Sequence, residues 1–335
     1  MDPSLSSDYY WTWYDQNSTG MMDWVMVSNP SATDDVYYQV RIAGSAQSSG
    51  KLGVGEHIQP TFPGVIGGPV EVKGCSLALA SDGSCPGTPQ NLLASQRVLS
   101  NGGSAFNELP GIPAASLSDT YWWTWYDQSS PGARDWVMLA NPGSASVYYE
   151  ATISGQNPGA GSSGTIPAGG YVTPSFTGKI GGPVKVQTWT DSSKQTPAKI
   201  IASQRSIWGP SFEEVPGMTA SDIAIPEPVY SWTWYDQQSA GAQNWVMVSN
   251  PGNQIYNGSI YYEITIGGQD PGPGSKGTVA PGQAVSPSFP GKAGGPVEVR
   301  AWTDSSKTVP APFMASQRAL WKGFFNETLA EHVEW

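Results

Sequence analysis

Two carboxylates and one arginine recur at matching places in three stretches of the chain. Two carboxyl groups that flank a glycosidic bond are the catalytic pair of most glycoside hydrolases. The same groups would also form an internal ion-pair network, because a buried arginine needs anionic partners. Three identical active sites in 335 residues would be unusual, so we predict a structural polar network and no catalytic residue. The network residues are Asp15, Arg97, Glu108, Asp127, Arg205, Glu214, Asp236, Arg318 and Glu327.

The sequence does not contain the residues that other common catalytic and ligand-binding sites require. The two histidines, His57 and His332, are not at equivalent places, so a Ser-His-Asp set cannot recur in each stretch. The chain has no Gly-x-Ser-x-Gly elbow, no phosphate-cradling glycine motif and no calcium-binding loop. The formal charge of −11 argues against nucleic acid, which binds clustered lysine and arginine. We therefore expect neither an enzyme nor a cofactor or metal site.

The tryptophans form two sets. Those that recur in all three stretches should lie in the core, because a tryptophan often packs between two sheets; they are Trp13, Trp24, Trp125, Trp136, Trp234 and Trp245. A second set occurs in two of the three stretches, beside predicted turns: Trp189, Trp208, Trp302 and Trp321. Their rings could contact a neighbouring domain or subunit, stack on a sugar or fill the core. We treat these four as candidate ligand or interface residues.

Two cysteines, Cys75 and Cys85, lie close together in the first stretch only. The hairpin that holds them is longer than its counterparts, and Cys75 stands where the other copies have tryptophan. A disulfide that closes this enlarged hairpin is the simplest explanation, and it implies an oxidising compartment. The alternative is a pair of free thiols in a cytosolic loop. A metal site is disfavoured, because neither histidine has a partner nearby.

These residues recur because the chain repeats one unit three times. Each copy begins with Trp-Thr-Trp-Tyr-Asp, whose second tryptophan is Trp13, Trp125 and Trp234, at separations of 112 and 109 residues. A unit of about 110 residues falls within the usual ~100–150 residues of a domain with its own core. We predict three domains, at residues 1–115, 116–224 and 225–335, and call them units 1, 2 and 3. The linkers between them, 110–119 and 216–228, contain proline and read as semi-rigid spacers.

Each unit is predicted to contain about seven short strands. In the first strand, residues 9–15, period-2 alternation places Trp13 and Asp15 on one face and Thr12 on the other. A later strand, residues 36–42, has counterparts in both other units. Alternating strands between turns rich in glycine and proline predict an all-β, immunoglobulin-like sandwich. Only the C-terminal tail, residues 327–335, has any suggestion of a helical period.

The composition also bears on location. No apolar run approaches the ~20 residues of a transmembrane helix, and the first residues lack the basic and apolar regions of a signal peptide. The low lysine content, the abundant serine, threonine and glycine, and the cysteines favour a mature form whose signal has been removed. We expect an extracellular or cell-surface location.

The ordered motifs resemble a repeat found in large secreted and cell-surface proteins of bacteria, notably Chloroflexi and actinobacteria. The resemblance spans nearly the whole chain. It implies an extracellular or cell-wall protein and no catalytic activity of the unit itself. The motifs that carry it are Trp-Thr-Trp-Tyr-Asp, Trp-Val-Met-Val-Ser-Asn-Pro, Gly-Gly-Pro-Val, Ala-Ser-Gln-Arg-Val-Leu and Phe-Asn-Glu-Leu-Pro-Gly.

Together these patterns predict a non-catalytic extracellular protein with a structural or adhesive role, either a rod or a subunit of a fibre. Its partners would then be copies of itself. The alternative is an array of carbohydrate-binding modules, in which three weak sites gain avidity for a cell-wall or surface glycan.

Overall fold

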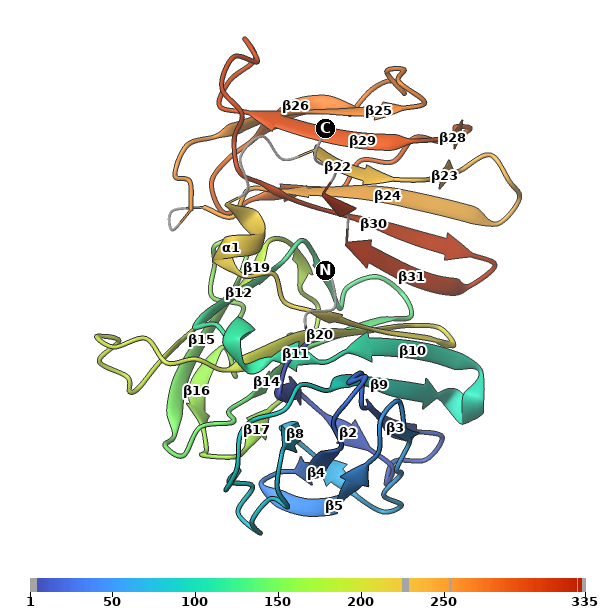
Figure 1. Cartoon of the computed structure of the whole chain (residues 1–335). Helices are drawn as coiled ribbons and strands as arrows, with labels where there is room; N and C mark the ends of the chain where they lie inside the picture. The colour runs from blue at the N-terminus through green and yellow to red at the C-terminus, as the bar shows by residue number, and fades with distance from the viewer. Residues whose placement is uncertain (1–4, 225–228, 253–254, 330, 333–335) are drawn as a thin grey trace.

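The computed structural model describes residues 5–224, 229–252, 255–329 and 331–332. Nearly all its regular elements are β-strands, which confirms the all-β prediction. Figure 1 shows the strands of unit 1 at the bottom of the molecule, those of unit 2 in the middle and those of unit 3 at the top.

Unit 1 forms two antiparallel sheets and a two-stranded ribbon. The sheets have the orders β11-β1-β8-β4-β5 and β10-β9-β3-β6, and the ribbon pairs β2 with β7. Short 3-10 turns lie at Asn101–Gly103 and Ala114–Ser116. The strands are β1 (Asp8–Trp11), β2 (Tyr14–Asp15), β3 (Met22–Ser28), β4 (Val36–Ile42), β5 (Ser45–Leu52), β6 (His57–Ile58), β7 (Ile66–Gly67), β8 (Val70–Cys75), β9 (Leu93–Ser100), β10 (Ala105–Pro110) and β11 (Ile112–Pro113).

Unit 2 repeats this arrangement. Its sheets have the orders β12-β19-β15-β16 and β17-β14-β20-β21, with the ribbon β13-β18. The strands are β12 (Thr120–Trp123), β13 (Tyr126–Asp127), β14 (Ala133–Ala140), β15 (Val147–Ile153), β16 (Ser163–Ile166), β17 (Tyr171–Val172), β18 (Ile180–Gly181), β19 (Val184–Trp189), β20 (Ile201–Trp208) and β21 (Ser211–Pro216).

Unit 3 has the same strand orders, β26-β25-β29-β22-β32 and β27-β24-β30-β31, with the ribbon β23-β28. The helix α1 (Ala220–Ile223) precedes it, started by a capping box between Thr219 and Asp222. The strands are β22 (Val229–Trp232), β23 (Tyr235–Asp236), β24 (Ala242–Ser249), β25 (Ile260–Ile266), β26 (Lys276–Val279), β27 (Ala284–Val285), β28 (Ala293–Gly294), β29 (Val297–Trp302), β30 (Met314–Trp321), β31 (Phe324–Leu329) and β32 (Glu331–His332).

The two main sheets of each unit share one apolar core. In unit 2 the core joins Trp123 and Val186 of the first sheet to Val137 and Leu139 of the second. Buried and partly exposed residues alternate strictly along β15, as the period of a half-buried strand requires. The fold is therefore a sandwich in which alternate residues of each strand are free to face outward.

The predicted first strand is interrupted. Residues 9–15 form β1 and β2, with a break at Thr12 and Trp13. Gly68 lies so close to the break that a Cβ on it would be 1.9 Å from the Thr12 carbonyl oxygen. Because the strand breaks, side chains on either side no longer alternate in one register. Thr12 and Trp13 instead contact residues of unit 2.

The tryptophans expected in the core are displaced from it. Trp234 is exposed, and the other five are half-buried: Trp13, Trp24, Trp125, Trp136 and Trp245. The tryptophan that lies in the core of its own unit is instead the one before the strand break, Trp11, Trp123 or Trp232. The prediction was wrong for Trp13, Trp125 and Trp234 because it assumed one continuous strand. It was wrong for the other three because each occupies a partly exposed position of β3, β14 or β24, between two buried neighbours.

The C-terminal tail is extended where the structure describes it. Strand β31 ends at Leu329, and β32 pairs with β22 in the register Tyr230↔His332. The suggested helical period of the tail is therefore wrong for these residues. Residues 330 and 333–335 lie outside the described part of the chain.

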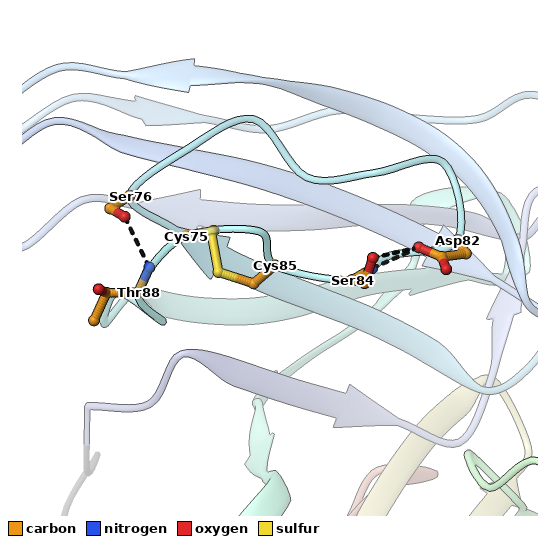
Figure 2. Close-up of a disulfide and its surroundings, with 6 residues drawn as sticks. All are labelled: Cys75, Ser76, Asp82, Ser84, Cys85 and Thr88. Atoms are coloured by element: carbon orange, nitrogen blue, oxygen red, sulfur yellow. Dashed lines mark hydrogen bonds between the residues drawn. A yellow bond between two sulfur atoms is a disulfide. The ribbon is translucent and has the colours of Figure 1, made fainter.

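Cys75 and Cys85 form a disulfide with a Cα–Cα distance of 5.7 Å. Figure 2 shows the bridge closing the enlarged hairpin of unit 1, next to the hydrogen bond from the Thr88 N–H to Ser76 Oγ (2.9 Å). Cys75 is fully buried at the end of β8. The cross-link thus ties the loop to the first sheet.

Removal of this disulfide should destabilise the protein. A bridge between residues separated by 10 positions contributes roughly 2–3 kcal/mol, mainly by restricting the unfolded chain. We expect the double change Cys75→Ser and Cys85→Ser to lower the urea midpoint accordingly, with the same loss in the reduced wild type. Equal midpoints for oxidised and reduced protein would contradict the expectation.

Candidate functional site

The recurrent arginines and glutamates lie opposite each other in the last hairpin of each unit. Arg97 pairs with Glu108 in the β9–β10 register, and the other two units repeat this. In each hairpin the arginine Nε donates to the glutamate Oε2, at 2.9, 3.0 and 2.9 Å in units 1, 2 and 3. The serine two positions before the arginine, Ser95 in unit 1, donates to the other glutamate oxygen, Glu108 Oε1, at 2.9 Å.

The recurrent aspartates have a different role from the predicted one. Asp15 Oδ1 accepts the backbone N–H groups of Asn17 and Ser18, at 3.0 and 2.8 Å. Asp127 and Asp236 cap the same turn in their own units. Among the described residues, no ion pair joins these aspartates to the arginine of their own unit. They shape the turn that follows the strand break.

The three arginine–glutamate pairs differ sharply in exposure. In unit 1 the side chains of Arg97 and Glu108 are 43% and 38% exposed. In unit 3 those of Arg318 and Glu327 are 4% and 5% exposed, and the pair in unit 2 is similarly buried. Equal sequences therefore occupy unequal environments. The cause is that each pair in units 2 and 3 is covered by the preceding unit.

Unit 1 covers unit 2 through the loop at its strand break. The hydroxyls of Thr12 and Ser203 both donate to Glu214 Oε1, at 2.8 and 2.7 Å. The ring of Trp13 meets that of Tyr171 edge-on, with centroids 4.3 Å apart. Tyr10 packs in an apolar cluster with Ala140 and Ile201 of unit 2. We call this interface joint 1–2.

Unit 2 covers unit 3 with the equivalent residues, and we call this interface joint 2–3. Thr124 donates to Glu327 Oε1 at 3.3 Å, beside the matching bond from Ser316 at 3.0 Å. Ser249 Oγ donates to the Thr124 carbonyl oxygen at 2.7 Å. Trp122 joins the apolar cluster of unit 3, as Tyr10 joins that of joint 1–2. The same contact scheme is therefore used twice.

Sequence reasoning missed a buried acid on the covering side of each joint. Asp135 Oδ2 accepts the Asp127 N–H at 2.6 Å and lies 3.6 Å from Arg318 Nη2 of the next unit. Asp23 has the same place in unit 1, where it interacts with Arg205. Unit 3 has Asn244 there. The sequence did contain a signal for this position. It holds an aspartate in units 1 and 2, which each cover a following unit, and an asparagine in unit 3, which covers none.

We define two surfaces from these contacts. The presenting face of a unit carries the threonine and tryptophan of the strand break and the buried acid, which is an asparagine in unit 3. In units 2 and 3 it also includes the tryptophan that ends β20 or β30. The receiving face carries the serine, arginine, glutamate and phenylalanine of the last hairpin. In the structure, unit 1 presents to unit 2 and unit 2 presents to unit 3.

The four candidate tryptophans separate into two environments. Trp208 lies in joint 2–3, where its ring stacks on Trp245 and Phe325 of unit 3 with centroids 6.4 and 5.9 Å away. Trp321, its counterpart in unit 3, is exposed. Trp189 and Trp302 lie at the ends of β19 and β29, in the first sheets and outside these contacts.

One carboxylate connects all three units. Glu213 Oε1 accepts from Asn107 Nδ2 of unit 1 at 3.1 Å, and its Oε2 accepts from Asn326 Nδ2 of unit 3 at 3.3 Å. Strands β10, β21 and β31, which carry these residues, thus lie side by side across the two joints. The middle unit is tied to both neighbours by a single side chain.

Burial raises the pKa of several joint carboxyls. The pKa of Glu213 rises to about 8, with a further contribution from the Glu327 carboxylate. The pKa of Asp23 rises to about 7, and that of Asp135 to about 6 because Arg318 opposes the effect of burial. Outside the contacts of the joints, burial likewise raises the pKa of Asp8 to about 7.

Stability should therefore increase as the pH falls from about 9 toward 5. An acid with a raised folded-state pKa holds its proton in the folded protein where the unfolded chain has lost it, so this contribution is lost as the pH rises through the folded-state pKa. Glu213→Gln should raise the unfolding free energy at pH 9 by about 1–2 kcal/mol and flatten the slope of stability against pH between 7 and 9. An unchanged slope in Glu213→Gln would contradict the assignment.

No model of a known protein family matches the chain, and no similar curated protein is found. The resemblance to the bacterial surface repeat stays a prediction. In the part of the chain that the structure describes, no helix is long and apolar enough to cross a membrane.

Proposed function

We propose that this chain is a non-catalytic structural protein of the cell exterior, in which three sandwich units are locked into one rigid body. The observation that carries the proposal is the repetition of one buried joint. Thr12 and Thr124 each hydrogen-bond to both a serine and a glutamate of the next unit. Flexible strings of domains have small, polar contacts between units, whereas these joints bury hydroxyls, aromatic rings and ion pairs together.

The recurrent acids are engaged in a way that suits structure rather than hydrolysis. Glu214 accepts Thr12 and Ser203 on Oε1, and Arg205 on Oε2 from both Nε and Nη2. Its side chain is 3% exposed. A carboxyl that serves as acid or nucleophile must instead reach the glycosidic bond. The burial and the saturated oxygens favour a role in holding units together.

The disulfide supports an exterior location for the same protein. Disulfides persist in secreted and surface proteins and are rare in the reducing cytosol. The Cys75–Cys85 bridge lies in unit 1, at one end of the stack. It would protect a terminal unit that only one joint stabilises.

Rigidity of the joints tests the proposal. Small-angle X-ray scattering of the intact chain should fit one fixed arrangement of the three units. The double variant Thr124→Val, Glu327→Gln removes the hydroxyl–carboxylate contact of joint 2–3 and should broaden the distribution of interdomain distances. Independent reorientation of the units in the wild-type protein would overturn the proposal.

Carbohydrate binding is a second candidate, favoured by a surface hollow on unit 3. The hollow has a volume of about 320 Å³ and is lined by Trp302, Glu298, Arg300 and Lys307, among others. A ring beside carboxylate and guanidinium groups can meet both the C–H face and the hydroxyls of a sugar. Lys307 Nζ lies 5.6 Å from the Trp302 ring centroid and covers part of that ring.

A glycan array would test this second candidate. Trp302→Ala should abolish binding at unit 3, and Trp189→Ala should do so at the equivalent position of unit 2. Binding that is indifferent to both changes, or no binding by the wild type, would remove the candidate. The surface variant Val309→Ser in the same hairpin serves as the control.

A further inference from the structure

The internal joints are heterologous, because the presenting face of one unit meets the receiving face of the next. A heterologous contact leaves one face of each kind unused at the two ends of an array, and it generates an open filament unless the rotation closes into a ring. In this chain the unused faces are the receiving face of unit 1 and the presenting face of unit 3. Neither face is covered by another unit in the structure.

The receiving face of unit 1 is already arranged for docking. Ser95 donates to Glu108 Oε1 at 2.9 Å and Arg97 to Oε2 at 2.9 Å, as in the two buried hairpins. The side chain of Phe106 is 57% exposed, whereas its counterparts Phe212 and Phe325 are buried. The face thus keeps the residues of a joint without the unit that would cover them.

The presenting face of unit 3 is exposed in the same way. Thr233 is exposed, although Thr12 and Thr124 at the same position are buried. Trp234 is 58% exposed, whereas Trp13 and Trp125 are half-buried. An exposed tryptophan and threonine at the end of the stack therefore match a partly exposed serine, arginine and glutamate at its start.

Building on the proposed structural function, we propose that unit 3 of one chain docks on unit 1 of a second copy through the same contact scheme, giving head-to-tail assembly. Thr233 then donates to Glu108 Oε1 of the second copy, beside Ser95, as Thr12 does at Glu214. Arg97 of that copy approaches Asn244, in the position where Arg318 approaches Asp135.

The aromatic residues at the two ends are complementary as well. Trp321 in β30 is the counterpart of Trp208 in β20. Trp208 lies opposite the first residue of β14, and Trp321 lies opposite the first residue of β24. In joint 2–3, Trp208 stacks on Trp245 and Phe325. Unit 1 offers Trp24 and Phe106 at these two positions, and Trp321 would stack on them.

The strand register also identifies a second aromatic contact of the proposed joint. His57 lies opposite Ser28 just as Tyr171 lies opposite Ala140. Because Trp13 meets Tyr171 in joint 1–2, Trp234 would meet the exposed ring of His57 in the second copy. The contact would place a histidine ring where joint 1–2 has a tyrosine ring.

Two substitutions make the proposed joint weaker than the internal ones. Ser231 stands where units 1 and 2 have the apolar Tyr10 and Trp122, and Asn244 stands where they have Asp23 and Asp135. An amide offers Arg97 a weaker partner than a carboxylate does. The two internal joints form within one chain, whereas the proposed joint forms between two chains, so this assembly should be reversible and depend on concentration.

Sedimentation velocity of the full chain over a range of concentrations tests the proposal. We expect the wild type to form dimers and longer species as the concentration rises. The double variant Trp234→Ala, Trp321→Ala disables the presenting face, and Arg97→Ala, Phe106→Ala disables the receiving face. Because these side chains are exposed in the single chain, both variants should fold, and each should weaken self-association by at least about tenfold.

A mixing experiment distinguishes this scheme from nonspecific association. The two double variants carry opposite intact faces, so a 1:1 mixture should form a heterodimer that grows no further. Asn244→Asp should tighten the association of the otherwise wild-type chain. The matched control Val309→Ser removes an exposed apolar group whose counterpart, Thr196, stays exposed although both faces of unit 2 are covered, and it should associate like the wild type.

The outcomes separate this proposal from the proposed function. A wild-type chain that stays monomeric at all concentrations, or associates equally well in both double variants, overturns head-to-tail assembly. The chain can still be one rigid body by small-angle scattering, in which case the structural function stands. Units that reorient independently within the monomer would instead overturn the structural function.

Discussion

Arg318→Ala should lower the unfolding free energy by about 3–5 kcal/mol, the usual cost of removing one partner from a buried ion pair. The Arg318 guanidinium lies 2.7 Å from Glu327 Oε2 and 3.6 Å from Asp135 Oδ2, and it donates to the Trp125 carbonyl oxygen at 3.4 Å. Its loss leaves two carboxylates buried without their cation. Urea unfolding followed by tryptophan fluorescence measures the change.

The chain supplies its own control for this experiment. Arg97 occupies the same motif and makes the same 2.9 Å bond to its glutamate, but both side chains are substantially exposed. Exposed ion pairs contribute about 0–1 kcal/mol, so Arg97→Ala should be nearly neutral. Equal losses for the two variants would show that burial by the preceding unit does not set the energetics of the pair.

Gly182→Ala should cost about 3 kcal/mol or more, at the upper end of what overpacking a tight contact costs. A Cβ at this position would lie 1.9 Å from the Thr124 carbonyl oxygen and 3.2 Å from Trp125 Cα. Both are backbone atoms, so the loop at the strand break must move. That carbonyl accepts from Ser249 of unit 3 at 2.7 Å, and the movement should therefore also loosen joint 2–3.

Two measurements separate these effects. Chemical unfolding gives the loss of stability, and small-angle scattering shows whether the units move apart. The control Gly178→Ala lies in a turn with φ of 74° and has no heavy atom within 4 Å of the added Cβ. It should cost about 1–2 kcal/mol from its left-handed conformation and leave the scattering curve unchanged. A stable, rigid Gly182→Ala protein would refute the tight contact.

The sheets of each unit could be predicted from the sequence because their signal is local. Strands such as 36–42 alternate apolar and polar residues, and glycine and proline mark the turns between them. The disulfide between Cys75 and Cys85 could likewise be predicted, because both cysteines lie in the same enlarged hairpin. The break at Thr12 could not be read in this way, because it depends on the approach of Gly68, 56 positions further along the chain.

The joints could not be predicted, and the reason is physical. Arg97 and Arg318 stand in identical Ser-Gln-Arg motifs, yet one is exposed and the other buried. Which copy is covered depends on how one unit packs on the next, and no residue pattern within a unit records that. The sequence pointed to a charged network within each unit, whereas the structure shows a pair within each unit, and in units 2 and 3 a threonine of the preceding unit completes it.

The position of Glu213 between Asn107 and Asn326 has a thermal consequence. When units are coupled through their interfaces, the loss of one exposes the faces of those next to it. Unfolding of the middle unit would therefore break the hydrogen bonds of Glu213 to both neighbouring units. A scanning calorimeter should accordingly record one heat-absorption peak for the whole chain, with a van't Hoff enthalpy that exceeds the value for a single unit.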